Sequence, residues 1–139
     1  MSVLETTTVT VTIEAPFERV ADDLADPARH PEWATEFFAG PAKAGRDGEV
    51  IVSVPQMGGD VSFRIDADQS RGILDLYLAP VGTAFGPPLP VRLVRNGDGV
   101  DVLWTLARPP HVANDDWSQG LESMRRELVN LKARLETDS

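Results

Sequence analysis

The sequence is 139 residues long, enough for one domain with a sizeable core but too short for two. With 13 basic and 22 acidic side chains the formal net charge is −9, which argues against non-specific binding to nucleic acid or anionic membranes. The absence of cysteine excludes disulfides, thiolate nucleophiles and cysteine-based metal sites, and His30 and His111 lack a metal-ligand spacing. No apolar run approaches the about 20 residues of a membrane-spanning helix, and the N-terminus does not resemble a signal peptide. We therefore expect a cytoplasmic protein without membrane insertion.

The N-terminal part predicts a strand followed by two short helices. Within residues 3–13, β-branched apolar residues alternate with threonines from Thr8 to Ile13, which is typical of a half-buried strand. Pro16 ends the strand and suits a first helical turn, and apolar residues at helical spacing follow over residues 17–24. Asp26-Pro27 has the form of a second helix start, with the aspartate as N-cap.

The middle of the chain, from about residue 38 to residue 107, predicts about six strands joined by turns. Asp-Gly at 47–48 and Asn-Gly at 96–97 are hairpin signals, and short turns make neighbouring strands antiparallel. Along these strands, the side chains that alternate with the apolar ones are expected to lie on a solvated outer face of the sheet: Arg64, Asp75, Tyr77, Arg92 and Asp101. The proline-rich segment 79–90 is long for a hairpin, so it is either a lid over a cavity or a contact surface for a second chain, as in a homodimer.

The last part predicts one long amphipathic helix. Apolar residues recur at spacings of four and three in a single stripe: Trp117, Leu121, Met124, Leu128, Leu131 and Leu135. Acidic side chains near its N-terminus and basic ones near its C-terminus favourably oppose the helix dipole. The order of elements indicates an α+β fold of two layers, one antiparallel sheet and one long helix, and a strongly curved sheet would leave a space between them.

Residues 13–20 and 30–33, with their Ala-Pro-x-x-x-Val and Pro-Glu-Trp steps, resemble the opening of the START-like superfamily. That group is also called SRPBCC and includes polyketide cyclase/dehydrase families. Residues 117–132 are similar to its long final helix. The resemblance implies a single helix-grip domain over residues 1–139: a seven-stranded antiparallel sheet wrapped around the C-terminal helix, two short helices after the first strand, and a deep cavity.

Three functions are compatible with this resemblance. The first is the binding of an apolar small molecule, of lipid, polyketide or aromatic type, by burial in the cavity. The second is a polyketide cyclase/dehydrase-like enzyme, which needs a titratable side chain in the cavity, and the sequence offers no carboxylate at a clearly inward position. The third is a protein-interaction module whose own side chains fill the cavity. The oxygenase members need more histidine ligands than the sequence provides, so we expect no cofactor.

The candidate ligand-binding residues are large or soft apolar side chains at inward or loop positions: Met57, Phe63, Leu76, Phe85, Trp104, Trp117, Leu121 and Met124. No catalytic residue and no metal ligand can be named. Trp33 is interpreted as a structural plug and His30 as a partly exposed helix residue. His111 is interpreted as a solvated loop residue, with a general base at the cavity mouth as the alternative.

The position of the cavity mouth follows from the order of the turns. In an antiparallel meander, successive turns fall at alternating ends of the sheet. The turns near 45–49, 67–72 and 96–99 therefore share one end, and the segments 55–60, 79–90 and 107–113 share the other. Because the second end has the longest loop, we expect ligands to enter there, under the loop from Ala79 to Pro90. Four residues are expected near the opening: Met57, Phe85, His111 and Trp117.

Overall fold

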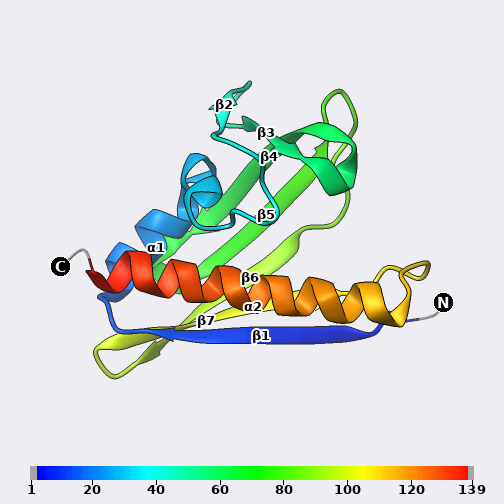
Figure 1. Cartoon of the computed structure of the whole chain (residues 1–139). Helices are drawn as coiled ribbons and strands as arrows, with labels where there is room; N and C mark the ends of the chain where they lie inside the picture. Colours follow the sequence, from blue (N-terminus) through cyan, green and yellow to red (C-terminus); the bar gives the residue numbers. More distant parts are fainter. Residues whose placement is uncertain (1–2, 138–139) are drawn as a thin grey trace.

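The computed structural model describes residues 3–137 and contains one seven-stranded sheet with a long C-terminal helix (Figure 1). The strands are β1 (Thr6–Ile13), β2 (Lys43–Ala44), β3 (Val50–Val54), β4 (Gly59–Asp68), β5 (Ile73–Pro80), β6 (Leu89–Asn96) and β7 (Gly99–Ala107). The helices are α1 (Phe17–Ala25) and α2 (Asn114–Thr137), with three short 3-10 helices, η1 (Pro27–Glu32), η2 (Pro55–Met57) and η3 (Gln69–Arg71). The expected α+β architecture is confirmed, including two short helices after the first strand.

The sheet has the order β1-β7-β6-β5-β4-β3-β2, and all neighbouring strands are antiparallel. Each strand from β2 to β6 pairs with the next strand in the chain, so the connecting turns alternate between the two ends of the sheet as expected. The segment with α1 and η1 carries the chain from β1 at one edge to β2 at the other. It thereby brings residues 27–38 beside the inner face of the sheet.

Alternation along the strands separates a buried inner face from a more exposed outer face. Trp104 pairs with Val9, and Phe63 pairs with Leu78, so their side chains share the inner face. On the outer face Arg92 Nη1 binds Asp75 Oδ1 at 2.9 Å, and both side chains are partly exposed. This ion pair matches the solvated outer position expected for Arg92 and Asp75.

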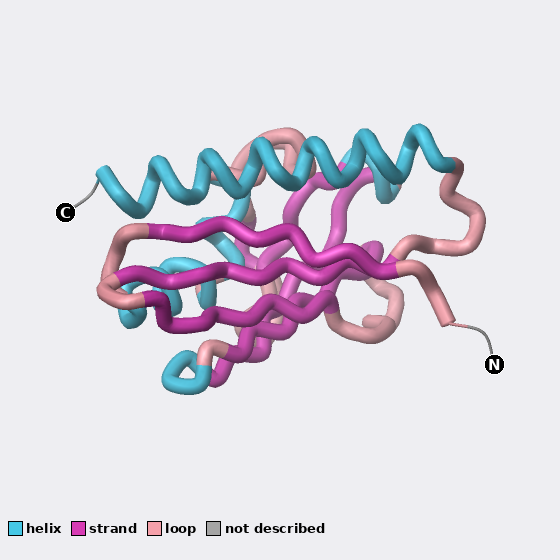
Figure 2. The backbone as a smooth tube through the Cα atoms, turned by 90° about the horizontal axis from the view of Figure 1, so that it is seen from below, coloured by secondary structure: helices cyan, strands magenta, loops and turns pink. Residues whose placement is uncertain are grey.

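The long helix α2 lies along β1 on one face of the sheet (Figures 1 and 2). The apolar face of its second half is buried, since Leu128, Leu131 and Leu135 are 1%, 0% and 3% exposed. In its first half Trp117 and Met124 are only half-buried. The two halves of α2 therefore have different roles: the second half packs on the core, and the first half borders a space between the helix and the sheet.

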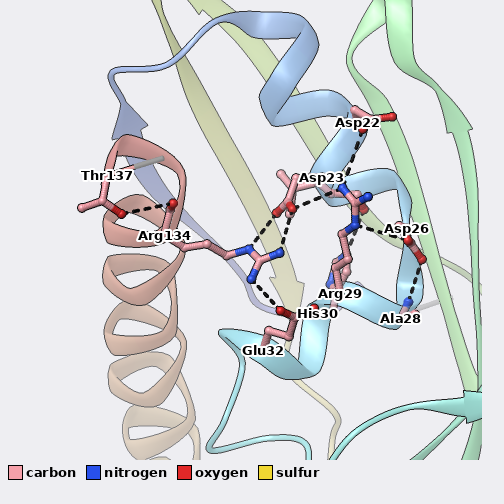
Figure 3. A network of polar contacts seen from close by, with 10 residues as sticks. Asp22, Asp23, Asp26, Ala28, Arg29, His30, Glu32, Arg134 and Thr137 are labelled. Carbon is pink, nitrogen blue, oxygen red and sulfur yellow. Dashed lines mark hydrogen bonds and ion pairs between the residues drawn. The ribbon is translucent and has the colours of Figure 1, made fainter. Parts of the chain in front are cut away.

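A network of charged side chains attaches α1 and η1 to the C-terminal end of α2 (Figure 3). The buried Asp23 carboxylate accepts a hydrogen bond from Arg134 Nη2 at 3.0 Å and lies 3.6 Å from Arg29 Nη1. Arg134 Nη1 also binds Glu32 Oε1 at 2.9 Å, which connects α2 to the end of η1. At the start of η1, Asp26 Oδ1 accepts from the Ala28 N–H at 3.0 Å, so the expected N-cap is confirmed. These contacts hold α1 and η1 against α2.

Candidate functional site

A cavity of about 200 Å³ lies between the inner face of the sheet, the segment that includes η1, and the first half of α2. Six aromatic rings line it: Trp33, Phe37, Phe38, Phe63, Trp104 and Trp117. Its aliphatic lining is Ala34, Leu76, Leu78, Leu89, Leu106 and Met124. The remaining lining residues are His30, Gln56, Gly120, Ser123 and Glu127. The wall is thus mostly apolar, with a small number of polar groups.

Five of these rings, all except Trp117, form one connected cluster with the ring of His30. Trp33 meets Trp104 edge to face, with ring centroids 5.7 Å apart. Phe38 stacks on Phe63 at 5.5 Å, and the His30 ring lies 5.2 Å from Phe63 and 5.3 Å from Trp33. Such offset and edge-to-face pairs hold the rings in fixed positions. The cavity therefore has a rigid aromatic floor.

His30 is buried in this cluster, so the expectation of a partly exposed helix residue is wrong. The cause is the geometry of η1: in a 3-10 helix residues three apart lie on the same side, which places His30 beside the inward-facing Trp33. His30 Nε2 donates a hydrogen bond to the Leu24 carbonyl at 2.8 Å. Burial lowers the pKa of His30 to about 4, against the weaker opposing effect of this bond, so the ring is neutral at pH 7.

Glu127 is the carboxylate in the cavity wall that the sequence analysis missed. It is 3% exposed, and its Oε2 accepts two backbone hydrogen bonds, from Glu36 N at 3.0 Å and Phe37 N at 2.9 Å. Burial raises the pKa of the Glu127 carboxyl above its ordinary value, and the two N–H bonds oppose this rise. A signal for it existed, because residues 117, 120, 124 and 127 follow the helical spacing of three and four.

The segment after η1 is fastened to α2 by further polar contacts, which close one side of the cavity. Glu36 forms a bidentate ion pair with Arg126, with N···O distances of 2.6 and 2.8 Å, and accepts a hydrogen bond from Ser123 Oγ at 2.9 Å. These bonds lower the pKa of Glu36 to about 2, the hydrogen bond from Arg126 having the largest effect. Asn130 Nδ2 donates to the Trp33 carbonyl at 3.2 Å. Phe37 and Phe38 are thereby held in the cavity wall.

Five of the eight residues named from the sequence line this cavity, namely Phe63, Leu76, Trp104, Trp117 and Met124. Met57 and Leu121 pack against the core beside it without lining it. Trp33, interpreted as a plug, is 2% exposed and is itself part of the wall. Its Nε1 is buried without a hydrogen-bond partner in the described part of the chain.

Phe85 lies elsewhere, because its loop folds onto the outer face of the sheet. Its ring is 5.7 Å from the ring of Tyr77 and 5.0 Å from the guanidinium of Arg64, and both of these residues point outward. The expectation that Phe85 lies at the cavity mouth is therefore wrong. The expectation that the loop 79–90 covers that mouth is wrong for the same reason. His111 is exposed in the loop before α2 and does not line the cavity.

The cavity opens at the end of the sheet that the turn order indicated, but beside a different segment. Gln56 in η2 and Gly120 in α2 are the exposed members of its lining. The opening therefore lies between η2 and the first half of α2. A Cβ atom added to Gly120 would meet no atom within 4 Å, which shows the free space at this point.

The arrangement of strands and helices matches that of solved structures. A START superfamily protein from Mycobacterium smegmatis superposes with a TM-score of 0.66 at 15% identity, over 96% of this chain and 99% of that one. Ara h 8.0201 superposes with a TM-score of 0.67 at 12% identity, over 97% and 99% of the two chains. The chain has the START-like, helix-grip fold.

DynU16, a protein in the dynemicin biosynthetic locus, also superposes, with a TM-score of 0.61 at 20% identity. The match covers 95% of this chain and 47% of DynU16. No protein-family model matches the sequence, and no curated protein does. At these identities the likeness concerns the START-like fold and not the activity. Within residues 3–137, no helix has the length and apolar character needed to cross a membrane.

Proposed function

We propose that this START-like domain binds an apolar small molecule in the cavity between the sheet and α2. The observation that carries the proposal is an unfilled space of about 200 Å³ with a wall of aromatic and aliphatic side chains. Ligand sites are typically concave and mostly apolar, with a few placed polar groups, and this wall has that composition. An interaction module with a filled interior would have no such space.

The size of the cavity narrows the ligand class. An engineered apolar cavity of about 150 Å³ binds benzene. A cavity of about 200 Å³ therefore suits a compact aromatic group with a short substituent better than a long acyl chain. The edges and faces of Trp33, Trp104 and Phe63 offer stacking and edge-to-face partners to such a group.

Binding can be tested with the neutral probe 2-ethylnaphthalene and a variant that fills the opening. Gly120→Leu places a side chain in the free space at the mouth, and leucine is a better helix former than glycine by up to about 1 kcal/mol. We expect the variant to lose probe binding, measured by quenching of the cavity tryptophans, while its melting temperature does not fall.

Gly120→Ala is the matched control, because it brings the helix-forming gain without filling the cavity. It should keep probe binding and melt at a higher temperature than the unchanged protein. Binding that persists in Gly120→Leu, or its absence in the unchanged protein, would contradict the proposal.

A second candidate function, a cyclase- or dehydrase-like activity, is favoured by one observation. Glu127 places a carboxyl with a raised pKa in the cavity wall, and shifted carboxyls of this kind serve as general acids or bases. The titratable group that such an enzyme needs is therefore present. Incubation with an aromatic β-hydroxy ketone tests this candidate: loss of water that is abolished in Glu127→Gln would support it.

A further inference from the structure

The charge of the cavity wall comes from a single side chain. Among the described residues that line the cavity, none is lysine or arginine, and Glu127 is the one carboxylate. The His30 ring is neutral at pH 7, because burial holds its pKa at about 4. Gln56 and Ser123 are uncharged. An ionised Glu127 therefore gives the cavity a net negative charge.

This charge is not neutralised by the groups around it. The neighbouring cation, Arg126, is engaged by Glu36 through two short contacts of 2.6 and 2.8 Å, so these two charges largely cancel. Glu127 has no ion pair of its own within residues 3–137. Its contacts are the two backbone N–H groups on Oε2, and Oε1 accepts no hydrogen bond from the described residues. A buried carboxylate without a basic partner is unusual, because burying a charge is costly unless the charge is paired.

The rest of the wall favours a positive charge as well. All 3 tryptophans of the chain line the cavity, together with Phe37, Phe38 and Phe63. Aromatic faces attract cations, tryptophan most strongly, and desolvated sites show the larger effect. The net charge of −9 raises the local concentration of cationic molecules around the protein.

We propose that the ligand carries a protonated amine on its apolar body and that Glu127 is the counter-ion of that amine. This inference rests on the proposed function, because it specifies the chemistry of a molecule held in the same cavity. The Glu127 carboxylate is desolvated by folding itself, so the incoming amine has to lose only its own hydration. Oε1 accepts the N–H of the ammonium group, and the aromatic rings surround the apolar body.

Three probes of one shape and different charge test this inference at pH 7: 2-naphthylmethylamine, its neutral isostere 2-ethylnaphthalene, and the anion 2-naphthylacetate. We expect the amine to bind at least about tenfold more tightly than the neutral isostere, a difference of about 1.4 kcal/mol. The anion should bind more weakly than both. This comparison uses the unchanged protein and does not depend on the folding of a variant.

Glu127→Gln then locates the effect. Its amide oxygen can accept the same two backbone N–H bonds, so the segment at residues 36–37 stays in place while the charge is removed. We expect the preference for the amine to disappear and the affinity for 2-ethylnaphthalene to stay the same. Glu122→Gln, on an exposed part of the same helix, is the matched control and should keep the preference.

The outcomes separate the two proposals. Equal binding of amine and neutral isostere, or tighter binding of the anion, would overturn the amine assignment and leave the apolar cavity standing. A preference for the amine that survives in Glu127→Gln would overturn the role of Glu127. Failure of all three probes to bind would instead refute the proposed function and the inference with it.

Discussion

Replacing His30 by glutamine should remove a defined part of the acid sensitivity of the fold. Burial lowers the pKa of His30 from 6.5 to about 4, so between these values the unfolded chain binds a proton that the folded chain does not. The contribution of the neutral His30 to the free energy of unfolding is therefore fully present above pH 6.5 and is lost as the pH drops toward 4. At about 1.4 kcal/mol per pKa unit, the loss from this group amounts to about 3 kcal/mol.

The measurement is the free energy of unfolding from urea melts at several pH values between 7 and 4. The His30→Gln amide can still donate to the Leu24 carbonyl, but it does not titrate, so its curve should be flatter than that of the unchanged protein across this window. His111→Gln, in an exposed loop, is the matched control. A His30→Gln curve parallel to the unchanged one would show that the ring is not held neutral by burial.

Three other predictions concern packing, the cavity wall and the charged network. Leu131→Ala should cost about 2–5 kcal/mol in denaturant melts, because this side chain of α2 is fully buried in the core, and a near-neutral result would mean that the end of α2 is not packed. Trp117→Ala should weaken binding of 2-ethylnaphthalene while costing less than the about 3–5 kcal/mol typical of a buried tryptophan, and a full loss of that size with unchanged binding would contradict this. Asp23→Asn should lower stability by about 1–3 kcal/mol, because it weakens the bond to Arg134, whereas Asp22→Asn, at an exposed carboxylate, should have little effect.

The fold could be predicted because its signals are local and repeated. Strict alternation gives strands, and the Asn-Gly at 96–97 lies in a tight turn in which Asn96 pairs with Gly99, as a hairpin signal predicts. The apolar stripe of the last helix identifies its buried face, with Leu128 and Leu131 at its centre. Each of these patterns is local: strands and helices show it in their periodicity, and the turn shows it in its residue types.

The site could be predicted only where the same periodicity applies. Phe63 and Trp104 line the cavity because strand parity decides which way they point. Phe85 belongs to a loop, where no period relates sequence position to direction, and its ring packs on Tyr77 outside. His30 was misplaced because η1 is only six residues long, too short for a repeating apolar pattern to show which of its sides faces the core.

Glu127 was missed because polar residues in an amphipathic helix are usually assigned to the solvated face. This carboxylate lies inside because two backbone N–H groups of the segment after η1 have no strand partner and use Oε2 as their acceptor. The need for an acceptor explains a polar side chain at this position, but it does not explain a charged one. An uncharged glutamine would accept the same two hydrogen bonds.

The charge at position 127 should therefore reduce stability in the absence of ligand. Burial raises the pKa of Glu127 in the folded chain above the unfolded value of 4.5, so the folded chain holds the proton more tightly. Stability from this group is present below pH 4.5 and is lost as the pH rises through the folded pKa. Glu127→Gln without ligand should thus match or exceed the stability of the unchanged protein at pH 7, with a smaller advantage at pH 4.5. A large loss of stability at pH 7 would show that the carboxylate stabilises the fold, and the argument that its charge serves a ligand would then lose its basis.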